Sequence, residues 1–191
     1  MAAAYPALTV PVLVCALAMP LAGCLRDPIV SARNVAPVGN WRVERQIDRA
    51  TGAPISSAYL ETRNSSHTGI AFSQPAGMQV SCFKNAPLVH FTFGYQIGST
   101  RNAEFAYRFD DKPGRTIKVR FVDDYKSVVI EGPNEVAQFL DEMESSAALY
   151  VLIRSFNRGR TSADFKLEGG ADAIKEALAG CPPGQATKRV S

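Results

Sequence analysis

Apolar and polar residues alternate in short runs along most of the chain, a period of two that is typical of antiparallel strands with one buried face. The clearest run spans residues 88–95, where Val89, Phe91 and Phe93 fall on one face. Further strands are expected over residues 41–47, 56–62, 77–83, 103–109, 117–121, 127–130, 148–156 and 161–167. Segments rich in Asp, Asn, Pro and Gly separate these runs, and residues 63–68 are expected to form a polar turn.

Two segments near the C-terminus follow a helical period instead. The first helix is expected to begin at Pro133, since proline is favoured at the first helical position. Its apolar face consists of Val136, Phe139, Leu140 and Met143. The second is expected from near Gly170 to Gly180, where Pro182 and Pro183 follow. Many short strands and two late helices predict a mainly β, α+β fold. We expect an antiparallel β-sandwich or open barrel with two short helices near the C-terminus.

The length of 191 residues accommodates one domain with a genuine core. We expect a single β-rich domain over residues 40–182 and a short, polar, disordered tail over residues 183–191. With 46% hydrophobic and 20% charged residues, the composition excludes collagen-like, coiled-coil and wholly disordered proteins. A net charge of +3 is too small to indicate nucleic-acid binding.

The N-terminal segment predicts export. Residues 1–25 carry no charged side chain, and residues 10–19 are nearly all apolar, which is typical of a secretory signal peptide over residues 1–23. The following Leu-Ala-Gly-Cys run resembles the bacterial lipobox, in which the cysteine, here Cys24, is lipidated and becomes the mature N-terminus. Three prolines and the short length argue against the alternative of a transmembrane helix.

The residues after Cys24 indicate where such a lipoprotein would reside. Residue 25 is leucine rather than aspartate, so nothing resembles the inner-membrane retention signal. We therefore expect a lipoprotein anchored in the outer membrane and facing the periplasm. Residues 24–39 are rich in Pro, Ala and Val and are expected to form a tether between the membrane and the domain.

Two cysteines remain in the mature domain, Cys82 and Cys181, and an exported chain with one such pair is expected to form a disulfide. Cys82 follows Val80 at strand spacing, and Cys181 follows Leu178 at helical spacing, so both thiols are expected on apolar faces. The alternative is a pair of buried, reduced thiols.

The sequence contains no complete pattern of catalytic or metal-binding residues. His67 is expected in a polar loop and His90 on the polar face of a strand, and neither has further ligands at metal-binding spacing. The paired carboxylates at residues 110–111 and 123–124 occur in turn sequences, where Asp is favoured for local hydrogen bonds. We therefore expect no enzyme activity, no metal and no cofactor.

Basic residues form the one candidate binding surface. It consists of Arg115, Lys118, Arg120, Arg154, Arg158 and Arg160, on two predicted hairpins. If these hairpins are neighbours, the cationic stripe would face acidic envelope polymers, lipid phosphates or a protein partner. The alternative is a set of solvated strand faces, on which Lys and Arg protect exposed edges.

The second half of the chain resembles a family of small periplasmic or lipid-anchored proteins associated with type VI secretion loci, the VasI type. The matching segments, in order, are residues 80–82, 107–110, 139–140, 149–154, 163–169 and 173–178, before Cys181. The resemblance covers residues 79–181 and implies a disulfide-bonded, β-rich envelope domain. It supplies no catalytic residues.

Three function classes follow from these observations. The favoured one is a non-catalytic envelope lipoprotein that binds or scaffolds an envelope protein or a wall polymer. The second is an inhibitor of a lytic enzyme or protease that presents the loop over residues 67–76. The third is a hydrolase, which requires a pocket holding His67 or His90 beside a carboxylate.

Overall fold

The computed structural model describes residues 34–47, 52, 54–98 and 103–181. The predicted signal peptide, Cys24 and the predicted tail over residues 183–191 lie outside the described residues. Among the residues described, no helix is long and apolar enough to cross a membrane.

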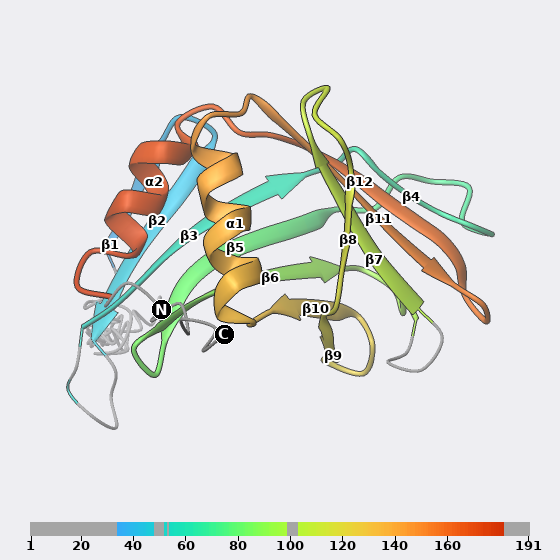
Figure 1. Ribbon diagram of the computed structural model, residues 1–191, viewed down its shortest axis with the longest axis horizontal. Helices are drawn as coiled ribbons and strands as arrows, with labels where there is room; N and C mark the ends of the chain where they lie inside the picture. The colour runs from blue at the N-terminus through green and yellow to red at the C-terminus, as the bar shows by residue number, and fades with distance from the viewer. Residues whose placement is uncertain (1–33, 48–51, 53, 99–102, 182–191) are drawn as a thin grey trace, which may run out of the picture.

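Two antiparallel sheets face each other (Figure 1), which confirms the predicted mainly β, sandwich-like α+β fold. Sheet A consists, in spatial order, of β1 (Asn34–Val38), β2 (Trp41–Ile47), β3 (Pro54–Thr62), β5 (Ala76–Phe83), β6 (Ala86–Phe93), β10 (Ser127–Ile130) and β9 (Arg120–Val122). Sheet B consists of β4 (Ser65–His67), β12 (Gly159–Lys166), β11 (Ala148–Ser155), β7 (Ala103–Phe109) and β8 (Arg115–Ile117). The two sheets do not join into a closed barrel in the described part of the chain.

The helices α1 (Pro133–Glu144) and α2 (Gly170–Ala177) lie on the same side of sheet A as sheet B does (Figure 1). The helix α2 contacts β2, β3 and β5, and α1 contacts β6 and α2. The predicted apolar face of α1 is confirmed, because Val136, Phe139, Leu140 and Met143 are its buried residues. The helices therefore cover the part of sheet A that sheet B leaves open.

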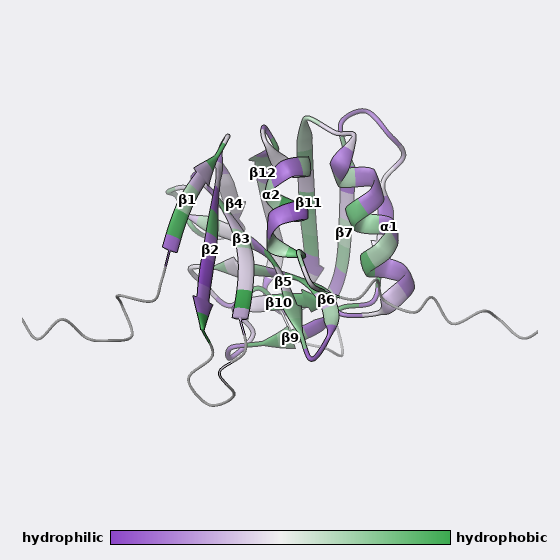
Figure 2. Ribbon diagram, turned by 90° about the vertical axis from the view of Figure 1, so that its left-hand side faces the viewer, coloured by the Kyte–Doolittle hydropathy of each residue, from purple (hydrophilic) through white to green (hydrophobic). Residues whose placement is uncertain are grey.

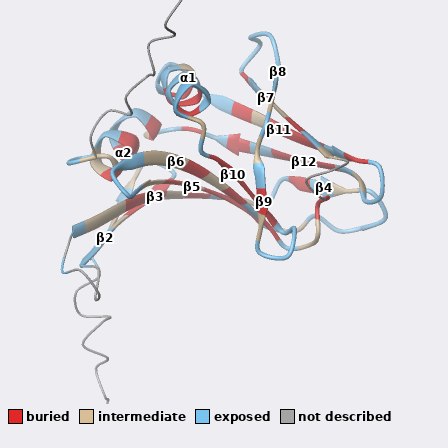
Figure 3. Cartoon of the chain, turned by 60° about the horizontal axis from the view of Figure 1, so that its bottom comes forward, coloured by how far each residue is buried: buried red, intermediate tan, exposed pale blue. Residues whose placement is uncertain are grey.

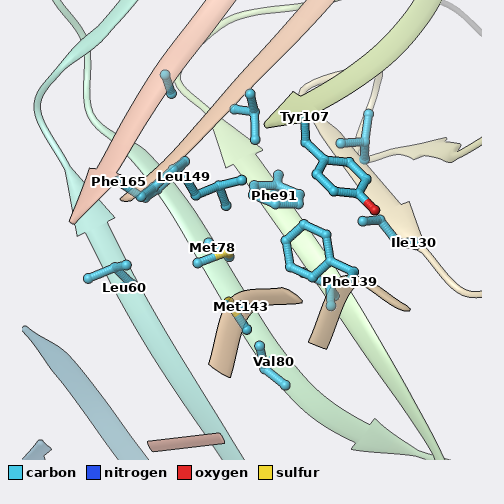
Figure 4. Close-up of a cluster of buried hydrophobic side chains, with 14 of the residues drawn as sticks. Leu60, Met78, Val80, Phe91, Tyr107, Ile130, Phe139, Met143, Leu149 and Phe165 are labelled. Carbon is cyan, nitrogen blue, oxygen red and sulfur yellow. The ribbon is translucent and has the colours of Figure 1, made fainter. Parts of the chain in front are cut away.

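Aromatic side chains join the two sheets and α1 into one core (Figure 4). The Phe139 ring of α1 lies 5.0 Å from the Tyr107 ring, 5.1 Å from the Phe109 ring and 6.0 Å from the Phe91 ring, measured between centroids. The Phe91 ring of sheet A also lies 6.0 Å from the Phe165 ring of sheet B. Phe139 is fully buried, so its side chain fills space that both sheets share.

The predicted disulfide between Cys82 and Cys181 is present, with 5.8 Å between the two Cα atoms and a sequence separation of 99. It joins β5, in the middle of sheet A, to the last described residue of the chain. The expected helical position of Cys181 is wrong. The helix α2 ends at Ala177, and Gly180 adopts a φ of 87°, which takes the chain out of the helix before Cys181.

The predicted tether over residues 24–39 is too long at its C-terminal end, because Asn34–Val38 form β1 and pair with β2 along their whole length. This strand was not predicted because its sequence, Asn-Val-Ala-Pro-Val, contains a proline and shows no strong alternation of apolar and polar residues. The turn after β1 lies against the turn before α2, and Asn40 N–H donates to the Glu168 carbonyl at 3.0 Å. Gly169 adopts a φ of +80°, and a Cβ there would lie 2.6 Å from the Val38 carbonyl oxygen, so this crossing requires glycine.

The predicted polar turn over residues 63–68 contains a short edge strand, β4, which pairs with β12. Its residues are Ser65, Ser66 and His67, which carry no strand-like hydrophobic pattern. Side-chain contacts accompany the pairing instead: the hydroxyl oxygens of Ser66 and Ser162 lie 2.9 Å apart. A tertiary partner therefore determines the conformation of this segment.

The predicted hairpin around residues 115–126 is divided between the sheets. The strand β8 pairs with β7 in sheet B, whereas β9 pairs with β10 in sheet A. The two residues between β8 and β9 carry the chain from one sheet to the other. A single strand over residues 117–121 is therefore wrong, because its two ends find partners in different layers of the sandwich.

Candidate binding surface

The outer face of sheet B carries a cluster of cations around one tyrosine, and the strand register places them. Tyr150 of β11 lies between Arg108 of β7 and Asp164 of β12. Four residues further along β11, Arg154 lies between Glu104 and Arg160. Alternate residues of a strand point to the same face, so both rows point away from the core. We call Arg108, Tyr150, Arg154 and Arg160 the cationic face.

The arginines of the cationic face differ in their partners from the four arginines that form ion pairs elsewhere in the described chain. The side chains of Arg108 and Arg154 form no ion pair or hydrogen bond with any described residue. Elsewhere, N to O distances of 2.6–3.3 Å join the pairs Arg42–Glu61, Arg45–Glu176, Arg115–Glu142 and Arg120–Glu131. Arg154 and Arg160 also oppose each other on paired strands, an arrangement of like charges that costs stability.

A shallow hollow of about 470 Å³ opens on this face. Its lining includes Ala106, Arg108, Tyr150, Leu152 and Arg160. Arg160 Nη2 donates to the Tyr150 hydroxyl oxygen at 3.2 Å, which positions one guanidinium group beside the ring. Guanidinium groups bind carboxylate and phosphate in a forked geometry. The hollow therefore suits an anionic group attached to a partly apolar unit.

The structure divides the six residues of the predicted cationic stripe. Arg154, Arg158 and Arg160 remain together on the β11–β12 hairpin. Arg115 belongs to the far edge of sheet B, Arg120 belongs to sheet A, and Lys118 lies between those two strands. Arg115 and Arg120 are already paired with glutamates, so a single stripe does not form.

Two residues of the cationic face were missing from the sequence prediction. The outward position of Arg108 follows from the alternation over residues 103–109, which was a usable signal. Tyr150 lies in a nearly continuous apolar run, Ala148–Ile153, in which alternation is not visible. Only the observed pairing shows that Tyr150 points outward.

The two histidines lie in different sheets and do not meet. The Nδ1 atom of His67 lies 2.7 Å from the Thr161 hydroxyl oxygen, and its ring lies 4.4 Å from the Tyr95 ring. The expected loop position of His67 is wrong, because His67 is the last residue of β4. Burial lowers the pKa of His67, and the positive charge of Arg158 lowers it further.

His90 is the histidine that lies beside a carboxylate. Its Nε2 atom lies 3.5 Å from the Asp123 carboxylate, which is longer than an ordinary hydrogen bond. Burial lowers the pKa of His90, and Asp123 opposes this shift only in part. Ser127, on the strand beside His90, is fully buried, so its hydroxyl cannot reach a substrate. Within the described ranges, no three His, Cys, Asp or Glu side chains lie close enough to hold a metal ion.

The comparisons with known proteins add no relative to this picture. No family model, no curated protein and no solved structure matches the chain.

Proposed function

We propose that the protein is a non-catalytic envelope lipoprotein that binds an acidic envelope partner through the cationic face. The lipobox-like sequence around Cys24 and the disulfide support export, because structural disulfides persist in oxidising compartments. In this proposal the acylated Cys24 anchors the protein in the outer membrane, and the domain faces the periplasm. The resemblance of residues 79–181 to the VasI type adds an association with secretion to the proposal.

One observation carries the binding function: arginines gather on the cationic face without anionic partners of their own. Arg108 and Arg154 have none among the described residues, and Arg160 contacts only the neutral Tyr150 hydroxyl in its side-chain hydrogen bonds. Arginines that stabilise the fold are expected beside carboxylates, as the four paired arginines are. A partner rich in carboxylates would supply the missing interactions. Wall peptides and acidic polysaccharides have this chemistry.

The loop between β4 and β5 supports the second candidate, an inhibitor-like domain. The hydroxyl oxygen of Ser73 lies 2.7 Å from the Ser65 carbonyl oxygen and accepts the Ser65 N–H at 3.1 Å. Thr68 N–H donates to the Arg160 carbonyl at 2.9 Å. Both ends of the loop are therefore fastened to strands, and a loop held in this way suits insertion into an enzyme cleft.

Mass spectrometry of the full-length protein, expressed in a Gram-negative host, tests the anchor. We expect the mature chain to begin at Cys24 and to carry acyl chains on that residue. A Cys24→Ser variant is the control and is expected to lack the acyl mass. Recovery of the parent protein with Met1 at its N-terminus and an unmodified Cys24 would contradict the proposal.

Sedimentation with purified peptidoglycan sacculi tests the cationic face. We expect the parent protein to bind and the triple variant Arg108→Gln, Arg154→Gln, Arg160→Gln to bind about tenfold more weakly, because charge-assisted hydrogen bonds are lost. The control variant is Arg42→Gln, Arg45→Gln, Arg120→Gln, which removes the same charge from arginines in ion pairs. Equal weakening in both variants would indicate a general charge effect. That result, or no binding by the parent, would overturn the proposal.

A further inference from the structure

Two phenylalanines at one end of the sandwich are the most exposed large apolar side chains among the described residues. Phe156 is 92% exposed and Phe72 is 79% exposed, and Ile70 beside Phe72 is 38% exposed. Phe156 lies in the β11–β12 turn, and Phe72 lies in the loop between β4 and β5. Single exposed apolar residues are common on protein surfaces, but two such rings on loops at one end of the molecule leave a local apolar surface that an external partner can cover.

The two loops lie at the same end of the molecule and are fastened to each other and to their neighbours. Thr68 and Arg160 exchange two hydrogen bonds: Thr68 N–H donates to the Arg160 carbonyl at 2.9 Å, and Arg160 N–H donates to the Thr68 hydroxyl at 3.0 Å. Arg158 Nη2 donates to Gln96 Oε1 at 2.6 Å, and Gln96 Nε2 donates to Asp124 at 3.3 Å. We call Ile70, Phe72, Phe156 and Arg158 the aromatic end.

The aromatic end is cationic as well as apolar. Neither residues 68–75 nor residues 156–160 include an Asp or a Glu, whereas Arg158 and Arg160 lie in or beside the β11–β12 turn. Arg154 lies opposite Arg160 on the paired strand, two residues before Phe156. Both loops project at the right-hand end of Figure 1 and are exposed in Figure 3. Exposed aromatic rings with a surrounding belt of arginines are typical of peripheral membrane contacts.

We propose that the aromatic end inserts Phe72 and Phe156 into the interface of a bilayer that contains anionic phospholipids, with Arg154, Arg158 and Arg160 on the phosphates. A standard protein interface takes about 800 Å² from each partner, whereas two phenylalanine side chains of about 150–250 Å² each supply roughly half of that area. The two loops also project from the domain, so a partner has to deform around them. A lipid interface can accept a small contact area and can deform around projecting loops, and it needs no preformed pocket.

This contact is separate from the predicted lipid anchor and goes beyond the proposed function. The strand β1, the first described element, lies at the left-hand end of Figure 1, and the aromatic end lies at the right-hand end. A lipid anchor before β1 and an aromatic end in a bilayer would therefore attach the domain at both ends of its long axis. The domain would then lie along a membrane or connect two membrane surfaces.

Tryptophan fluorescence of the full-length chain tests the insertion. In a Phe156→Trp variant bound to vesicles of phosphatidylcholine and phosphatidylglycerol, we expect emission at shorter wavelength and quenching by brominated acyl chains. The native Trp41 is the only tryptophan of the chain and is 1% exposed, so brominated lipids do not reach it. Adding Arg158→Gln, or omitting phosphatidylglycerol, is expected to reduce the quenching.

A Phe83→Trp variant is the matched control. Phe83 is 60% exposed and ends β5, beside the disulfide rather than at the aromatic end. We expect its emission to remain accessible to aqueous iodide and insensitive to brominated lipids. Equal quenching at both positions would show contact through the anchor alone and would overturn the proposal. Quenching of the Phe156→Trp emission by iodide but not by brominated lipids would also overturn the proposal. That result would favour a protein partner for the aromatic end. These substitutions leave the cationic face intact, so the two proposals fail separately.

Discussion

Removal of the disulfide is expected to have the largest effect on stability. We expect the Cys82→Ser, Cys181→Ser double variant to lose about 4–5 kcal/mol of unfolding free energy, because the bond closes a loop of about 100 residues in the unfolded chain. For a domain of this size that loss corresponds to a melting temperature lower by roughly 10–20 °C. Thermal unfolding followed by circular dichroism measures it.

Two controls separate the bond from the side chains. Reduction of the parent protein with a thiol reagent is expected to lower its melting temperature to that of the double variant. The same reagent is expected to leave the double variant unchanged, since its domain holds no other cysteine. A double variant that melts within a few degrees of the oxidised parent would show that contacts of α2 alone hold the chain end in place.

Truncation of Phe139 is expected to have the second largest effect. The change Phe139→Ala removes a fully buried ring that touches Phe91, Tyr107 and Phe109, so it leaves a cavity between the two sheets and α1. Such substitutions cost about 3–5 kcal/mol. Urea unfolding at equilibrium measures the change as a lower midpoint with an unchanged slope.

Phe83→Ala is the matched control for this prediction, because Phe83 is 60% exposed. It is expected to change the unfolding free energy by less than about 0.5 kcal/mol, as surface substitutions usually do. If Phe139→Ala cost no more than Phe83→Ala, the ring would not be part of a tightly packed core. The side-chain packing in Figure 4 would then not be what holds α1 against the two sheets.

The elements that the sequence predicts well are those whose hydrophobic pattern is strong and local. The buried face of α1 and the alternation of β6 and β7 report burial directly, since every phenylalanine and tyrosine of these elements is buried. The strands that were missed, β1 and β4, are short and polar or contain proline, and only a neighbouring strand stabilises them. Pairing between distant segments leaves no trace in local periodicity.

The candidate site was predictable to a smaller extent for the same reason. The disulfide was predictable because only two cysteines remain after the predicted signal segment and Cys24. The grouping of Arg154, Arg158 and Arg160 followed from their position on one hairpin. Whether Arg115 and Arg120 join that group depends on which sheet each strand enters. Their engagement by Glu142 and Glu131 depends on tertiary contacts that spacing along the chain does not encode.

The strand β1 has a practical consequence for where the protein can be shortened (Figure 2). Three of the four sheet edges end in strands of three residues, and the fourth is β1, where Pro37 has no N–H to offer. A chain cut back to residue 40 would lose that cover and leave the backbone donors and acceptors on one edge of β2 unpaired, because only β3 would still pair with this strand. The truncated protein is expected to aggregate through pairing between the exposed β2 strands of different molecules, and to precipitate on overexpression. An expression boundary placed before residue 34 would keep β1 paired with β2 and is expected to avoid this aggregation.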